Sequence, residues 1–454
     1  MKYFSYIFCI ILLFSSSCAS KKVVSTLPPF TVYKPLLSSF VINYKLDKKA
    51  IRDAFNQSVS EIFNENFNIP DYDIKMNFYK TKDATVDIEG KSILVNIPVG
   101  ILLEKNTFLL DFKARGVIEL TFITNFDIDS SWNFNSKTDL SYYKWVEKPV
   151  LNMGVIKVPI EPVSNVIIGK SKSFIVESID EAIAQNFDIK KTINESIQAF
   201  REPMQLDPQN GGYLTVTPKR IQLTHLKNTK LFTSGKIVID AHTLFSIHKP
   251  VVSPYPLPNP AMAWNNFVGD TSTLRLVTQI NMMDINTLVR KNYDGKVFSA
   301  QGKSFTLSSI FVNCDYEKIR FVADIKGDSN GTLMISGYPE YDPALNALHV
   351  KNIDISFKTK NKFHKAASWI AEGAIKNELT KMLFFPLEAK IDDIQNNINQ
   401  QLEEINTEFN IDIKAVVLSI RSEHFELKPG KIETTLKTTM NLQAYIKDLK
   451  TLGQ

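Results

Sequence analysis

Residues 319–325 read Ile-Arg-Phe-Val-Ala-Asp-Ile, and this stretch shows the pattern that governs most of the chain. Ile, Phe, Ala and Ile occupy every second position, which places them on one face of an extended strand. Residues 40–46 and 118–122 alternate in the same way. The pattern predicts long, half-buried strands in antiparallel sheets. Further strands are predicted at 92–99, 107–114, 229–245, 272–285, 332–337, 348–359 and 411–440.

Two dipeptides supply turn chemistry between such runs. Asn330-Gly331 lies between the run at 319–325 and the one at 332–337, and Asp294-Gly295 has similar composition. Asn-Gly and Asp-Gly readily adopt the positive φ values that a type I′ turn requires. Both dipeptides are therefore predicted to join antiparallel strands.

Only a few segments switch to helical spacing. A first helix is predicted after Asp47, whose carboxylate can accept a hydrogen bond from a free N–H of the first turn. A second is predicted from a capping box formed by Ser178 and Glu181, with a break at 187–188. Their apolar faces comprise Ile51, Ala54, Phe55, Val59 and Ile62 in the first helix, and Ile189, Ile193, Ile197 and Phe200 beyond the break.

The strongest helical pattern lies at residues 387–409. Its opposite face is filled with Asp, Glu, Asn and Gln, which is typical of a solvated surface. A preceding helix is predicted from about 364 to 385 and should end or kink at Pro386. The apolar stripe, at steps of three and four, comprises Leu387, Ile391, Ile394, Ile398, Leu402, Ile405 and Phe409.

A proline-rich stretch interrupts this organisation. Five prolines fall within residues 250–260, which is too dense for a helix or a central strand and predicts an extended linker at 250–262. The linker separates residues 28–249 from residues 263–454, each with long strands and at least one amphipathic helix. The predicted fold class is α+β, with long curved antiparallel sheets rolled around a few amphipathic helices in two tandem units.

The N-terminus has the organisation of a signal peptide over residues 1–17. Lys2 precedes an apolar run that is shorter than the ~20 residues needed to span a bilayer, and three serines follow it. The Cys18 that comes next resembles the lipobox of bacterial lipoproteins, although Ser15 stands where that motif usually has Leu. The resemblance implies an acylated Cys18 and a tether over residues 18–27; the alternative is ordinary cleavage beside an incidental cysteine. Because Ala19 is not acidic, the same resemblance implies the outer membrane, with the protein facing the periplasm.

Charge and cysteine content narrow the function classes. The net charge is only +5 and no basic run is present, so nothing favours nucleic-acid binding. Cys9 lies in the predicted signal peptide and Cys18 at the lipidation site, which leaves Cys314 without a disulfide partner. Its neighbours Phe311, Val312 and Tyr316 predict a buried structural thiol.

No local motif supports catalysis, a metal or a cofactor. The six histidines show no zinc spacing, and no GxSxG elbow occurs. Gly169-Lys170-Ser171 and Gly302-Lys303-Ser304 lack the earlier glycine of a P-loop. We therefore expect no catalytic residue, no metal and no cofactor, although a site assembled from distant strands would leave no such signature.

Five segments carry a family resemblance: Gln198–Pro203, Tyr213–Pro218, Gly337–Asp342, Leu348–Phe357 and Lys360–Ile370. With them the chain resembles an uncharacterised family of bacterial lipoproteins of about this length. The order of elements and the proline-rich centre also resemble the tubular lipid-binding superfamily that includes bactericidal permeability-increasing protein. That resemblance implies an apolar tunnel, but no specific ligand contact.

Together these patterns predict a non-catalytic protein that is tethered to the membrane by lipid and binds a lipid or another apolar ligand in an elongated groove. Two alternatives stay open: an envelope interaction scaffold with a fully packed core, and a hydrolase with a non-local active site. The sequence does not indicate protein partners. The side chains expected to line the groove are Phe55, Ile62, Ile391, Ile394, Ile398 and Leu402.

Overall fold

The structure is a computed structural model. It describes residues 36–447, except for 63–65, 70–73, 107–110, 154–155, parts of 160–187, 206–211, 301–302, 329, 359–383 and 410. The predicted signal peptide, Cys18 and the tether lie outside the described residues. So do Ser178 of the predicted capping box and residues 364–383 of the helix predicted at 364–385. The last two residues of that predicted helix, 384–385, belong instead to a short strand.

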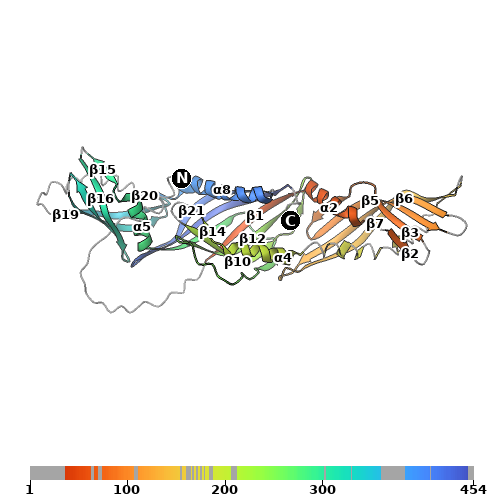
Figure 1. Cartoon of the computed structure of the whole chain (residues 1–454), viewed down its shortest axis with the longest axis horizontal. Helices are drawn as coiled ribbons and strands as arrows, with labels where there is room; N and C mark the ends of the chain where they lie inside the picture. The colour runs from red at the N-terminus through yellow and green to blue at the C-terminus, as the bar shows by residue number, and fades with distance from the viewer. Residues whose placement is uncertain are drawn as a thin grey trace.

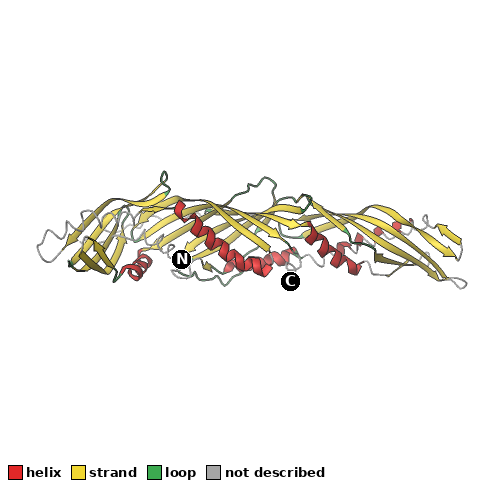
Figure 2. Cartoon of the chain, turned by 90° about the horizontal axis from the view of Figure 1, so that it is seen from above, coloured by secondary structure: helices red, strands yellow, loops and turns green. Residues whose placement is uncertain are grey.

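The described chain is elongated and consists of three mainly antiparallel sheets in a row, with a few helices packed on them (Figures 1 and 2). This confirms the α+β class. The first sheet comprises β2 (Asn66–Ile69), β3 (Ile74–Lys80), β4 (Thr85–Glu89), β5 (Ser92–Asn106), β6 (Asp111–Ile128), β7 (Phe134–Met153) and β8 (Ile156–Pro159). The third sheet comprises β15 (Val297–Ala300), β16 (Lys303–Cys314), β17 (Ile319–Gly327), β18 (Gly331–Asp342), β19 (Ala347–Lys358) and β20 (Phe384–Pro386).

The central sheet joins strands from the two ends of the chain. Its main path runs β13-β10-β12-β1-β14-β22-β21, with β9 and β11 attached at the side. These strands are β1 (Leu37–Asp47), β9 (Met204–Gln205), β10 (Tyr213–Leu223), β11 (Lys227–Asn228), β12 (Phe232–Ser246), β13 (Ala261–Trp264), β14 (Ser272–Asn281), β21 (Ile411–Lys428) and β22 (Lys431–Ile446).

The predicted boundary at 250–262 therefore does not separate two independent sheets. Residues 249–260 contain no helix or strand, in keeping with an extended segment. However, β1 from the first predicted unit pairs in parallel with β22 from the second, and β12 pairs with β14. Backbone hydrogen bonds thus link the two predicted units within one sheet, a pairing between distant segments that composition alone could not reveal.

Two predicted strands need correction. The run predicted at 411–440 is a hairpin of β21 and β22, and the strand predicted at 272–285 is only partly right. The strand expected at 272–285 ends at Asn281, where α5 (Met282–Tyr293) begins. From this point the buried side chains Ile285, Leu288 and Val289 follow helical spacing. Arg290 and Lys291 in the last turn interact favourably with the helix dipole.

Both predicted type I′ turns need correction. Gly331 begins β18, and among the described residues of the β17–β18 hairpin the positive φ belongs to Gly327 at 147°. The side chain of Asn330 instead accepts a hydrogen bond from the Gly327 N–H at 3.2 Å. Asp294-Gly295 connects α5 to β15 rather than two strands, with Gly295 at φ 78°. The hairpin at 327–331 was predicted correctly, but its turn chemistry was not.

Each described α-helix packs its apolar face on a sheet. Asp47 caps α2 (Lys48–Ile62) as predicted, accepting a hydrogen bond from the Lys49 N–H at 2.7 Å. α2 covers the first sheet and α5 the third, while α4 (Ile189–Gln198) and α8 (Ile391–Phe409) pack on the central sheet. Short 3-10 turns follow α4 at Ala199–Arg201 and precede α8 at Glu388–Lys390.

A second contact recurs on these helices: a side-chain carboxamide both donates to and accepts from the backbone of one distant residue. We call each such contact a carboxamide pair. α8 forms two of them along β21, which is the edge strand of the central sheet, and Gln395 adds a single bond from the Val417 N–H. The pairs, with bonds of 2.7–3.1 Å, are Asn56–Ala84, Gln198–Leu257, Asn286–Val312, Asn399–Ala415 and Asn406–Ile413.

We predict that Asn286→Leu lowers the free energy of unfolding by about 2–4 kcal/mol, because it leaves the N–H and the carbonyl of Val312 unsatisfied in a buried site. Chemical denaturation monitored by circular dichroism measures the loss. The control is Thr287→Ala on the exposed side of the same helix, which should change stability by less than about 0.5 kcal/mol. Equal losses in the two variants would show that the carboxamide pair is not the cause.

Candidate functional site

The central sheet has two unlike faces, which the strand register defines. Ile42 on β1 lies opposite Ile237 on β12 and beside Leu442 on β22, so these three side chains share one face. Ile237 packs with Ile189 and Ile193 of α4. This is therefore the face on which α4 packs, and we call it the helix-bearing face.

α8 packs on the same helix-bearing face, at the opposite margin of the sheet, along β21. Ile391, Ile394 and Ile398 pack against Val417 and Ile420 of that strand. Figure 1 shows α8 and α4 on opposite margins of the central sheet, with β1 running between them. Among the helices that the structure describes, α4 and α8 pack on this face, and they do so at its margins.

Apolar side chains on the middle strands between these margins stay part-exposed and lie outside the clusters that the described side chains of α4 and α8 form. These side chains are neighbours on the sheet. Leu442 and Ile446 lie on the same face of β22, and Ile42 and Ile413 lie on the two strands that flank β22 in this region. We call Ile42, Ile413, Leu442 and Ile446 the uncovered row.

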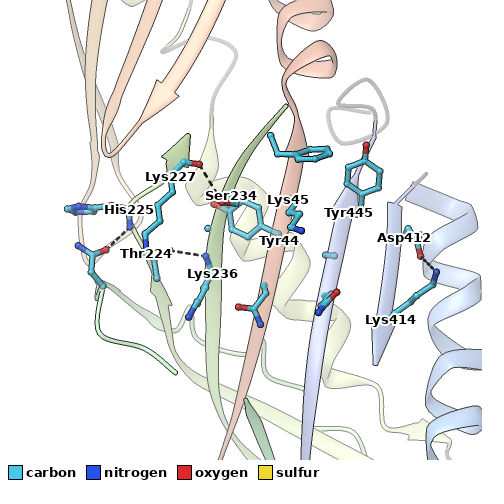
Figure 3. Close-up of a pocket in the computed structure, with 16 residues that line it drawn as sticks. Tyr44, Lys45, Thr224, His225, Lys227, Ser234, Lys236, Asp412, Lys414 and Tyr445 are labelled. Carbon is cyan, nitrogen blue, oxygen red and sulfur yellow. Dashed lines mark hydrogen bonds and ion pairs between the residues drawn. The ribbon is translucent and has the colours of Figure 1, made fainter. Parts of the chain in front are cut away.

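The opposite face carries a pocket of about 850 Å³, which we call the basic pocket (Figure 3). Two adjacent rungs of the sheet form its floor. One rung comprises Ser234, Lys45, Tyr445 and Asp412, contributed by β12, β1, β22 and β21. The next rung along the same strands comprises Lys236, Asn43, Gln443 and Lys414.

Four lysines and only one carboxylate line this pocket. Lys414 lies 3.5 Å from Asp412, and Lys236 pairs at 2.5 Å with the exposed Asp270 outside the lining. Among the described residues, neither Lys45 nor Lys227 forms an ion pair. The pocket therefore has a net positive lining, which favours an anionic ligand.

Tyr44 and Gly235 fit together on the helix-bearing face, because each lies two positions from Ile42 or Ile237 on its strand. The two residues lie opposite each other on β1 and β12, and a Cβ added to Gly235 would lie 2.6 Å from the Tyr44 hydroxyl oxygen. Gly235 therefore leaves the space that the Tyr44 ring occupies. Burial raises the pKa of Tyr44 to about 12, so the phenol stays neutral at physiological pH.

Residues 37–446 match the family described as "Domain of unknown function (DUF4403)". The chain belongs to this family. The expected resemblance to an uncharacterised family is thereby confirmed, and the match spans all three sheets of this DUF4403 protein. No curated protein matches the chain.

Among solved structures, the DUF4403 chain is similar to a crystal structure of lipopolysaccharide binding protein. The identity is 9%, the TM-score is 0.27, and the alignment covers 90% of this chain and 99% of that chain. A similarity of this size carries no residue correspondence. The tubular, tunnel-forming architecture therefore stays a prediction.

The structure distributes the six predicted groove residues over separate clusters. Phe55 packs with the first sheet, whereas Ile391, Ile394 and Ile398 pack with the central sheet and with Leu348 of the third. Leu402 is part-exposed on α8, and the side chain of Ile62 lies outside the described residues. These residues are not brought together around either described pocket.

Sequence reasoning missed both the uncovered row and the basic pocket. A usable signal was present, because each floor strand places polar side chains at two alternate positions, as at Asn43 and Lys45 or Asp412 and Lys414. What the sequence could not show is that these four strands are neighbours.

Two further groups bear on chemistry. Cys314 is buried as predicted, and burial raises the pKa of its thiol, which disfavours the reactive thiolate.

One cluster of side chains has the atom types that bind metal ions. It comprises His424, Glu426 and Glu433, whose nitrogen and oxygen atoms lie within 4.8 Å of one another. Burial raises the pKa of Glu433, but hydrogen bonds from Lys428 and Lys431 outweigh burial and leave that pKa below its ordinary value. These lysines already neutralise the carboxylate that a cation would need.

No helix of the described part of the chain combines the length and the apolar character that a membrane crossing requires.

We predict that Tyr44→Phe reduces the alkaline sensitivity of the fold. The phenol has a pKa of about 12 when folded and about 10 when unfolded, so its contribution to stability is complete below pH 10 and is lost as pH rises toward 12. The parent protein should lose up to about 2 kcal/mol more than the variant between pH 9 and pH 12. Urea denaturation at several pH values measures this difference. Parallel stability curves for the two proteins would contradict the assignment.

Proposed function

We propose that this DUF4403 protein is a lipid-anchored, non-catalytic protein of the cell envelope that binds a lipid or another apolar ligand on the helix-bearing face of its central sheet. The anchor is the lipid on Cys18, and the protein is placed at the outer membrane, facing the periplasm. The lipobox-like sequence supports the anchor and its location.

The observation that carries the ligand proposal is the uncovered row. Single exposed apolar residues are common on protein surfaces and need no explanation. Here, however, four part-exposed apolar side chains lie together on neighbouring strands between two amphipathic helices. An extended apolar chain laid between α4 and α8 would remove this row from water, which is favourable in proportion to the buried area.

Mass spectrometry of bound lipid tests the proposal. The chain from residue 19 onward, which contains every described element, is purified without detergent and extracted with organic solvent. We expect an apolar compound in roughly stoichiometric amount from the parent. Ile42→Thr combined with Leu442→Ser should lower that amount about twofold or more, because each change makes the row more polar.

A matched control separates a site effect from general destabilisation. Leu94→Ser with Val146→Thr changes two exposed apolar strand residues of the first sheet and should leave the extract unchanged. Thermal unfolding of all variants checks that each is folded. Equal loss of lipid in both double variants would contradict the proposal. So would a parent protein that yields no apolar compound and takes up no fluorescent fatty acid.

A further inference from the structure

The basic pocket lies on the face of the central sheet opposite the uncovered row, so an inference about it stands apart from the proposed apolar-ligand site. Its size lies in the range of small-ligand sites and exceeds what a single ion needs. Its floor is built from four strands, which fixes the spacing of the side chains that a ligand would meet.

Two lysines in this pocket have no ion-pair partner within the described part of the chain. Lys236 and Lys414 already have carboxylate neighbours, whereas Lys45 is exposed and, like Lys227, forms no ion pair with any described residue. A phosphate or another anionic group could therefore bind Lys45 and Lys227 without breaking an existing pair. The hydroxyl of Ser234 lies on the same rung as Lys45 and donates to the carbonyl of Lys227 at 3.4 Å, so these two lysines flank the same floor residue (Figure 3).

Two large, exposed apolar side chains directly adjoin lining residues in the sequence, and we call them the rim. Leu231 precedes Phe232 of the lining and is 63% exposed, and Phe267 follows Asn266 of the lining and is 98% exposed.

The exposure of Phe267 is fixed by its loop. The Phe267 N–H donates to the side chain of Asn265 at 3.0 Å, and the Lys236 ammonium donates to the carbonyls of Val268 and Gly269, each at 3.2 Å. The loop thus holds the ring out toward solvent next to a cationic pocket. Exposed apolar side chains beside lysines are the combination that binds peripheral proteins to anionic membranes.

We propose that the basic pocket is a docking site for an anionic lipid surface: it receives a phosphate-bearing headgroup through Lys45 and Lys227, while Leu231 and Phe267 enter the interfacial region. The two contributions are complementary, because the lysines recognise charge and the rim recognises the apolar layer below it. Binding should therefore depend on anionic lipid, weaken with salt and require the rim.

Vesicle co-flotation tests this proposal with the chain from residue 19 onward. The probes are vesicles of phosphatidylcholine alone and of phosphatidylcholine with phosphatidylglycerol. We expect binding only to the second kind. Lys45→Gln with Lys227→Gln should weaken that binding roughly tenfold or more, and Phe267→Ser should weaken it severalfold.

The control is Lys82→Gln with Lys326→Gln, which removes the same charge from exposed positions in the β3–β4 loop and on β17. It should bind anionic vesicles like the parent. A loss equal to that of the pocket variant would attribute binding to net charge and overturn the site.

Inorganic phosphate in the same assay distinguishes a lipid headgroup from a free anion. Retention of binding at millimolar phosphate supports docking on a lipid surface. Full displacement by phosphate, or no binding of the parent to anionic vesicles, overturns the proposal. Lipid extraction reports on the helix-bearing face alone, so either proposal can fail without the other.

Discussion

The carboxamide pair is the interaction on which much of this architecture depends. An edge strand presents unpaired N–H and carbonyl groups, which are costly when buried and invite pairing with another chain when exposed. β21 is such an edge, and α8 satisfies it through Asn399 and Asn406 while its isoleucines pack on the same strand. Asn286 does the same for Val312 next to an irregular stretch of β16. The helices therefore fix the backbone of their partners as well as covering apolar surface.

Most of the fold could be predicted because period-two and helical spacing are local properties. The alternation at 319–325 correctly indicated β17, and the apolar stripe beginning at Ile391 correctly indicated α8. Errors arose where a signal was short or its partner distant. Asn and Gln on α8 were interpreted as a solvated face, since nothing local shows that Asn399 meets Ala415. The linker likewise suggested two separate units, whereas the pairing of β1 with β22 depends on residues about four hundred positions apart.

The candidate sites were less predictable than the fold for the same reason. Ile391, Ile394 and Ile398 were chosen because they are apolar and periodic, and these properties describe a packed helix face equally well, as their cluster with Val417 shows. The uncovered row could not be distinguished in sequence from any other alternate strand residues. Its exposure depends on how far across the sheet α4 and α8 reach, and this is decided by the tertiary packing of the helices.

Strand register links the two faces of the central sheet. On β1, Ile42 lies on the helix-bearing face, while Asn43 and Lys45 face the basic pocket on the opposite side. On β22, Leu442 lies on the helix-bearing face and Gln443 faces the pocket. A slip of one residue would exchange the faces, placing lysines under the helices and isoleucines in the pocket. The long pairing of β21 with β22 and the carboxamide pairs to α8 oppose such a slip, because both depend on one alignment. The interactions that protect the sheet edge therefore also keep an apolar surface and a cationic surface on opposite sides of the same strands.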